Sequence, residues 1–181
     1  DYRGVLVEAS CNHPAVSNAP AIICYTDVFW RNACKYQARE YRHSFWDCGT
    51  ILANTLAISS ANEISAQVVM GFVDTTVNDL LGLDTLKEVS LALAPLGHAP
   101  DWTAKSASVV EPLSLDVLPI SDFETDFPPV REMHQASSLM SQDEVVSWHE
   151  TDTANKKVSP VGRLVPLDLY PETELPQDTV E

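Results

Sequence analysis

The run RNACKYQAREYR, Arg31 to Arg42, is followed at once by SFWDCGTILANTLAIS, Ser44 to Ser59, and later by VVMGFVDTTVNDLLGLD, Val68 to Asp84. The first run holds four of the eleven basic residues of the chain and two of its five tyrosines. Guanidinium and phenol groups gathered before a helix suit an anionic ligand, such as a phosphate, better than they suit a core. This run is therefore a candidate binding site.

The surrounding sequence predicts an α+β fold. Apolar residues recur at helical spacing after Ser44, which together with Asp47 resembles a capping pair, so we expect a helix from Ser44 to about Ala61. A second, short helix is expected after the cap residue Asp74, with Gly82 as its left-handed C-terminal residue. Strands are expected at 21–25, 66–72 and 87–96, and a short helix leading into a loop at 28–36.

The second half of the chain has a different character. Residues 98–181 carry sixteen Asp/Glu against five Lys/Arg and nine of the twelve prolines. We predict a domain at 1–97 and an irregular, Pro-rich acidic extension at 98–181. Within the extension, one or two short helices are expected around 131–149, the second capped by Ser141 with Glu144 at its third position. Residues 150–181 are expected to form a linker or tail.

Composition excludes several classes of function. The net charge of −15 argues against nucleic-acid binding, because no basic stripe offsets phosphate repulsion. No apolar run approaches the ~20 residues that span a bilayer, and no signal-peptide pattern is present. The four cysteines and five histidines show no metal-binding spacing, so we expect no metal site and reduced thiols in a cytoplasmic protein. No GxGxxG, Walker or GxSxG element occurs.

Three runs carry a family resemblance: KYQAREYRHSFWDCGTILANTLAIS, MGFVDTTVNDLLGLD and EVSLALAPLG. They resemble the flavin-dependent SagB/ThcOx dehydrogenases of the nitroreductase-like superfamily, over roughly Val28 to Gly97. The resemblance implies an FMN-binding α+β fold that works as a homodimer or beside a companion nitroreductase-like domain, with flavin between the two. Relatives of this kind oxidise thiazoline or oxazoline rings of peptides to thiazole or oxazole.

The same resemblance implies the site residues. Lys35 and Tyr36 match the Lys-Tyr pair of the catalytic motif, which implies proton transfer; the alternative is a surface lysine beside a packed tyrosine. Arg39 and Arg42 stand three residues apart, so on a helical turn they could hold one phosphate. Surface ion pairs with nearby acidic residues are the alternative. The remaining predicted cofactor contacts are Asn54, Gly71 and Phe72. A packing contact would explain Asn54 equally well. A plain turn from strand to helix would explain Gly71 and Phe72 equally well.

One departure from the family pattern leaves a second function open. The arginine-and-serine segment that helps to bind the FMN phosphate in the superfamily has no counterpart in residues 1–20, so we expect the later part of a nitroreductase-like domain. The chain is then either part of an FMN-dependent peptide dehydrogenase or a non-catalytic half that completes a dimer or binds peptide. A nitroreductase acting on small molecules is a third possibility.

Overall fold

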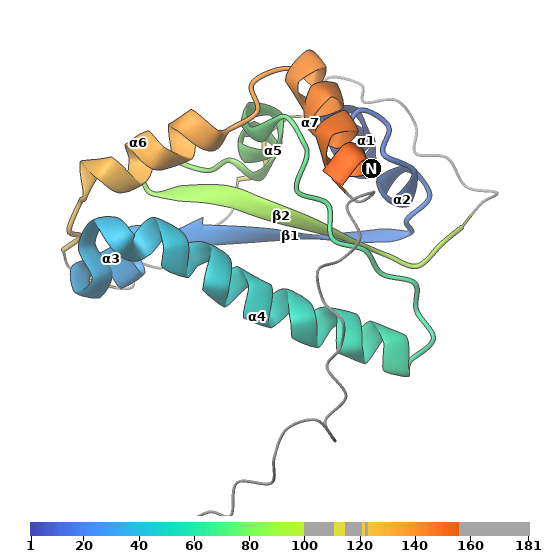
Figure 1. Ribbon diagram of the computed structural model, residues 1–181, viewed down its shortest axis with the longest axis horizontal. Helices are drawn as coiled ribbons and strands as arrows, with labels where there is room; N and C mark the ends of the chain where they lie inside the picture. The colour runs from blue at the N-terminus through green and yellow to red at the C-terminus, as the bar shows by residue number, and fades with distance from the viewer. Residues whose placement is uncertain (100–110, 115–120, 122, 156–181) are drawn as a thin grey trace, which may run out of the picture. The chain divides into compact units, whose positions relative to one another are not determined.

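The computed structural model describes residues 1–99, 111–114, 121 and 123–155. Two antiparallel strands, β1 (Ala21–Val28) and β2 (Glu88–Leu96), form its sheet. The long helix α4 (Glu40–Ala61) lies along one face of the strand pair, and α1 (Arg3–Ala9) and α5 (Asp74–Leu81) lie on the other (Figure 1). The α+β prediction is confirmed. The other helices are α2 (Pro14–Ser17), α3 (Trp30–Tyr36), the 3-10 turn η1 (Gln37–Arg39), α6 (Pro128–Ser137) and α7 (Gln142–Asn155).

Residues 1–149 form one compact unit in which β2 separates two apolar layers. Leu93 points to the layer made with α1 and α5, where Leu6 and Val77 are buried. Ala92, Ala94 and their neighbours point to the layer made with α4 and α6. The fold is therefore a strand pair covered by helices on both sides, as an α+β domain requires. The second unit, 150–181, is described only through residue 155, within α7.

A β-bulge reverses the direction of the side chains along β2. Tyr25 pairs with Ala92 and the next residue, Thr26, pairs with Ser90, so Leu91 is the extra residue. Strict alternation would place Leu91 and Leu93 on one face. Because of the bulge, Leu91 joins the α4 layer and Ser90 turns towards α5, where its backbone and hydroxyl groups donate to the Asn78 side chain at 2.8 Å each.

The predicted start of the long helix was wrong. Ser44 lies inside α4, one turn after its first residue, and the predicted partner Asp47 accepts a hydrogen bond from the Asn32 amide instead. The helix begins earlier because η1 leads directly into Glu40, whose side chain is buried and contacts the Ser44 hydroxyl. A cap residue and a helix-interior serine have the same sequence signature when both precede apolar residues.

The predicted strand at 66–72 was also wrong. Only Ala66 and Val69 pair with β2, as isolated bridges to Leu96 and Leu93. The ladder is interrupted opposite Pro95, which has no N–H to donate and only accepts from Gln67 at 3.4 Å. The segment therefore follows the edge of β2 without becoming a third strand.

The remaining predicted elements are confirmed where the structure describes them. The strands at 21–25 and 87–96 are β1 and β2, and Gly82 ends α5 with a φ of 68°. The expected helix at 28–36 is α3, and the helices around 131–149 are α6 and α7. Ser141 accepts from the Glu144 N–H, and the Glu144 carboxylate accepts from the Met140 N–H at 2.6 Å, a capping pair.

The predicted extension is described only in part. Residues 111–114 and 123–127 have no regular secondary structure, as expected, and the other residues predicted as irregular between 100 and 122 lie outside the described ranges, apart from 121. Val130 of α6 and Val145 of α7 are both buried. The division at residue 97 stays a prediction, and residues 156–181 of the predicted tail lie outside the described residues.

Candidate functional site

The basic run of the sequence occupies α3, η1 and the first turn of α4. Lys35, in the last turn of α3, is exposed, as are Arg39 and Arg42. The positive φ of Gln37, 53°, marks the turn that connects α3 to η1. The sequence thus brings the predicted catalytic pair and the two predicted phosphate-binding arginines to one part of the surface.

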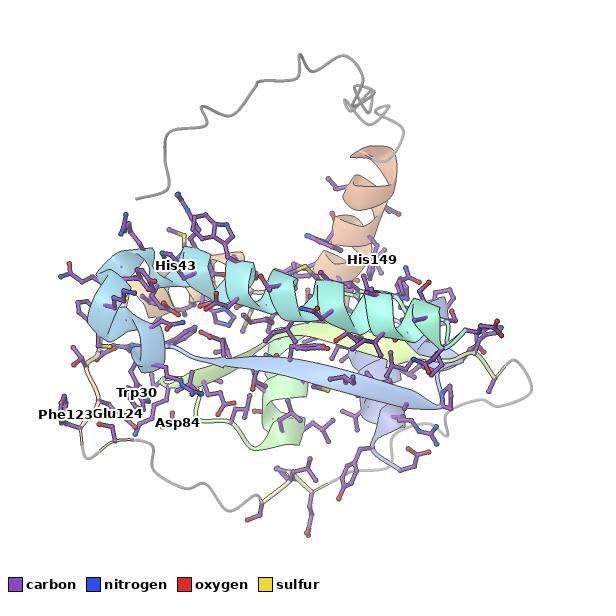
Figure 2. The ribbon with its side chains drawn as sticks, turned by 90° about the horizontal axis from the view of Figure 1, so that it is seen from below. Trp30, His43, Asp84, Phe123, Glu124 and His149 are labelled. Carbon is purple, nitrogen blue, oxygen red and sulfur yellow. The ribbon has the colours of Figure 1, made fainter. Side chains whose placement is uncertain are left out.

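Aromatic rings join these cations in a cation–aromatic patch formed by Lys35, Tyr36, Arg42, His43 and Trp46. The Tyr36 and His43 rings stack with centroids 3.7 Å apart, and Trp46 meets His43 edge-on at 4.9 Å. The Lys35 Nζ lies 4.9 Å from the Tyr36 ring, and the Arg42 guanidinium lies 5.8 Å from the Trp46 ring. Cations held over ring faces remain available to anions, so the patch suits a ligand that is both aromatic and anionic. Figure 2 labels His43 on α4.

Polar groups are buried at the start of α4. The Ser44 hydroxyl lies 2.7 Å from Asp27 Oδ2 and 3.1 Å from Glu40 Oε1. Burial is the main cause that raises the pKa of Glu40 to about 7, reinforced by the nearby Asp27 and Asp47 charges and opposed by the Ser44 hydrogen bond. Burial also raises the pKa of Asp27. These groups connect the start of α4 to β1.

A cavity of about 280 Å³, here called the central cavity, lies between α4, β2, α6 and α7. Its walls are mainly aromatic and apolar, with hydroxyl, carboxyl and imidazole groups among them. This composition is typical of small-molecule sites, which combine apolar walls with a few polar groups. The lining residues are Tyr41, Phe45, Met70, Phe72, Asp74, Ser90, Leu91, His134, Ser137, Leu139 and Trp148.

Burial governs the protonation of the polar groups in the central cavity. It raises the pKa of Asp74 to about 6, against two backbone hydrogen bonds that lower it, one of them from the Leu139 N–H at 2.7 Å. Burial lowers the pKa of His134, whose Nδ1 is buried without a hydrogen-bond partner in the described part of the chain. Burial also raises the pKa of Tyr41, whose hydroxyl is hydrogen-bonded to that of Ser137. His134 and Tyr41 are therefore neutral near pH 7.

Gly71 and Phe72 lie beside this cavity, but the space next to Gly71 is filled. A Cβ atom added at Gly71 would lie 2.6 Å from the Trp148 ring and 2.8 Å from the His149 ring. Phe72 is 2% exposed and belongs to the layer made with α1 and α5, with one part of its surface lining the cavity. The glycine thus allows α7 to approach the 70–74 segment.

The predicted cofactor contacts do not converge on one place within this chain. Asn54 is exposed on α4 and donates to the Thr50 carbonyl at 2.9 Å. It lies twelve residues after Arg42, or about 18 Å along the helix. Phe72 is the one predicted contact that lines the central cavity, and Gly71 is covered by Trp148. The predicted contacts therefore do not form an FMN site by themselves.

A smaller cavity of about 180 Å³ lies at the α3 end of the strand pair. Trp30 and Glu124, which both line it, lie near one another in Figure 2. Glu124 is held there by an ion pair with Lys87 at 2.8 Å, and Arg131 pairs with Asp126 at 2.6 Å. Because its ionic groups are paired at the rim, this cavity has less to offer a ligand than the central cavity.

Two classes of site receive no support from the described ranges. Among the residues that the structure describes, no group of three or more His, Cys, Asp or Glu side chains could hold a metal ion. Within the same ranges, no helix is long and apolar enough to span a membrane.

The chain has a nitroreductase-like fold. It is similar to a crystal structure described as that of a "putative nitroreductase" from Anabaena variabilis, with a TM-score of 0.61 and 28% sequence identity. The match covers 78% of this chain and 29% of that one, so the chain spans less than a third of the solved protein. No family model matches the sequence, and no curated protein matches it either.

Sequence reasoning missed most of the central cavity. Tyr41 stands inside the quoted basic run, but its contact with Ser137 joins residues ninety-six positions apart. His134 was not predicted as part of a site, because most of its neighbours in the cavity come from other elements. The prediction of Asp74 as the cap residue of α5 was wrong, because Val73 precedes the helix without a side-chain cap and Asp74 is its first residue. The Asp74 carboxylate accepts instead from the N–H of Leu139, sixty-five residues away. The signal that the sequence offers for such a cavity residue is a titratable side chain on the otherwise apolar face of a predicted helix.

Proposed function

We propose that this chain forms part of an FMN-dependent oxidoreductase of the SagB/ThcOx type, which oxidises thiazoline or oxazoline rings in a peptide substrate. The nitroreductase-like fold supports the broader class of flavin oxidoreductases. The observation that carries the proposal is the clustering of the motif run: the cations Lys35, Arg39 and Arg42 and the rings of the cation–aromatic patch gather where α3, η1 and the first turn of α4 meet.

The FMN site would be completed by a second body, either a second copy of this chain or a companion nitroreductase-like domain. Arg39 and Arg42 would bind the phosphate through guanidinium groups. Asn54, Gly71 and Phe72 are the other proposed contacts, and Asn54 lies about 18 Å farther along α4 than Arg42. The 29% coverage of the solved nitroreductase structure leaves the remainder of such a site to other residues.

Lys35 would remove the proton from the azoline ring, and Tyr36 would orient the substrate or relay that proton. A lysine acts as a base near neutral pH when burial or a neighbouring cation lowers its pKa. Because the Lys35 side chain is exposed here, the burial would come from the second body. The proposal therefore requires an assembly in which the cation–aromatic patch is covered.

A Lys35→Ala variant tests this assignment in the assembled protein. We expect it to retain visible flavin absorption after purification with FMN, and to lose turnover of an azoline peptide by a factor of ~10² or more. Lys87→Ala is the matched control, since Lys87 is also exposed but pairs with Glu124 and is not part of the patch. Unchanged turnover in Lys35→Ala would remove Lys35 from the mechanism.

The second candidate function is a non-catalytic half that completes a dimer or binds peptide. The observation favouring it is the packing of Trp148 and His149 against Gly71, which occupies the space proposed for the flavin ring. This function predicts a colourless protein that gains no flavin absorption on titration with FMN, yet forms a stable assembly in sedimentation experiments. Flavin binding with 1:1 stoichiometry per site would exclude it.

A nitroreductase acting on small molecules is separated from the main proposal by its substrates. Reduction of nitroaromatic compounds with NAD(P)H, without oxidation of azoline peptides, would support it.

We place the protein in the cytoplasm, in agreement with four cysteines that are all unpaired thiols.

A further inference from the structure

The Ser44 hydroxyl stands between two carboxyl groups, and it has one hydrogen to donate. It lies 2.7 Å from Asp27 Oδ2 and 3.1 Å from Glu40 Oε1, with the Glu40 carbonyl farther away at 3.3 Å. A hydroxyl can donate to one acceptor at a time while accepting from another group. If both carboxyls were ionised, one of the two short contacts would bring oxygen atoms together without a hydrogen between them.

A single additional proton satisfies every short contact in this group. With Glu40 protonated, its Oε1–H donates to Ser44 Oγ, and the Ser44 hydroxyl donates to the shorter contact, Asp27. Glu40 is 0% exposed, and its Oε2 has no partner of regular hydrogen-bond geometry among the described residues. Burial raises the pKa of Glu40 by more than the nearby Asn32 side chain lowers it. An ionised carboxylate in that position would therefore have fewer donors than a buried charge requires.

We infer that Glu40 and Asp27 hold one proton between them through Ser44, and that this proton latches the start of α4 to β1. The latch positions the segment that carries Lys35, Arg39 and Arg42, because η1 and the first turn of α4 are continuous with Glu40. Glu40 is thus a positioning residue. The inference rests on the three side chains alone and holds whether or not the chain binds flavin.

The charges around the latch oppose a second negative charge there. Asp47 on α4 acts on both acids, and Glu88 on β2 acts on Asp27. Arg31 on α3 is the cation that acts on Asp27, and it is exposed. From α6, His134 approaches α4 through the Tyr41 ring at 6.1 Å, and burial lowers its pKa so that it adds no charge near pH 7. The net influence therefore favours one retained proton.

The stability contribution of the latch depends on pH in a definite direction. Burial raises the pKa of Glu40 from 4.5 to about 7 in the folded chain, so the folded chain binds this proton more tightly than the unfolded chain does. The contribution is fully present below about pH 4.5 and is lost as the pH rises through about 7. Raising the pH should therefore loosen the start of α4.

Thermal unfolding of the full chain at several pH values tests the latch. Glu40→Gln replaces the protonated acid by an amide that donates to Ser44 at every pH. Between about pH 6 and pH 9, we expect the melting temperature of the wild type to fall by about 3 °C or more beyond that of Glu40→Gln. Glu8→Gln, which changes an exposed acid on α1, is the matched control and should follow the wild type.

A measurement on the unmodified chain keeps the inference falsifiable if the variant fails to fold. Carboxyl carbon NMR of the wild type should show Glu40 titrating near pH 7 and Asp27 titrating above its ordinary range. The inference is overturned if Glu40 titrates near 4.5, or if the wild type and Glu40→Gln show parallel melting curves across this pH range.

Discussion

The side of α4 that begins with Glu40 and Ser44 and the side that carries Ile51 and Ile58 present opposite kinds of surface. At the start, Glu40 and Ser44 are buried at 0% and 1% exposure. Farther along the same helix, Ile51 and Ile58 are exposed at 54% and 64%. The two regions differ in what they contact: the first meets β1 through polar groups, and the second has an outward side that meets nothing in the described part of this chain.

This difference shows that α4 serves two purposes. Its inward side, with Cys48 and Leu52, completes an apolar layer against β2. Hydrogen bonds of Ser44 with Asp27 and Glu40 fix the position of its start. Its outer side carries the exposed apolar side chains of Ile51 and Ile58, which do not contribute to the core of this unit. Exposed apolar surface of this kind often marks an interaction site. It agrees with our proposal that a second body completes the protein.

The largest expected effect compares neighbouring residues on opposite sides of α4. Leu52→Ala removes a side chain that is 8% exposed within the layer against β2, and should lower the free energy of unfolding by about 2–5 kcal/mol. Ile51→Ala removes an exposed side chain and should change it by less than about 0.5 kcal/mol. Urea unfolding of the two variants measures both. Equal losses would mean that the outer side of α4 is packed in solution.

A smaller effect is expected at the buried start of the helix. Ser44→Ala leaves Asp27 and Glu40 without the hydroxyl that connects them, which should lower the free energy of unfolding by about 1–3 kcal/mol. Ser60→Ala, at an exposed position of the same helix, is the control and should be close to neutral. A neutral Ser44→Ala would show that the polar contacts do not locate the helix.

Asp74 offers a weaker pH effect outside α4. Burial raises its pKa from 3.8 to about 6, so its contribution is fully present below about pH 3.8 and is lost as the pH rises through about 6. Asp74→Asn should therefore flatten the pH dependence of the melting temperature between about pH 4 and pH 6.5. We expect a smaller change than at Glu40, because two backbone hydrogen bonds already favour the ionised form. Calorimetry would measure it, and an unaltered slope would contradict the expectation.

The smallest effect on folding should come from the outer side of α4. Ile58→Ser should change the free energy of unfolding by less than about 0.5 kcal/mol, since Ile58 is 64% exposed. If a second body covers this side, the same variant should weaken assembly in analytical ultracentrifugation. An assembly of unchanged strength would place the partner elsewhere on the chain.

Local patterns in the sequence were sufficient for most elements of the fold. The signals of Gly82 and of the strand at 87–96 depend on residues close in the chain, and both elements were predicted correctly, although the bulge at Leu91 interrupts the alternation of that strand. The errors arose where distant residues decide the outcome. Pro95 interrupts the pairing of 66–72, and Asp27 draws Ser44 into the helix interior. Neither contact can be deduced from residues within one turn or one strand.

For the candidate site, the sequence predicted which residues form the basic surface run, but not the cavity beside it. The run from Lys35 to Arg42 was recognised because its composition is unusual and because it resembles a known motif. Its roles in proton transfer and FMN binding stay predictions, since Asn54 lies about three turns farther along α4 and the space beside Gly71 is filled by Trp148 and His149. The central cavity escaped notice because it brings together side chains from α4, β2, α6 and α7, which only the tertiary structure makes neighbours.

The extra residue in β2 has a consequence for any rearrangement of this strand. Deleting Leu91 would restore regular alternation and leave Val89 and Ser90 on the sides that they occupy now, because Leu91 is the residue without a partner of its own on β1. The Asn78 amide oxygen would keep both of its donors, and the layer made with α4 would lose one apolar side chain. A shortening by one amino acid at this point would therefore reduce packing without changing which residues face which helices.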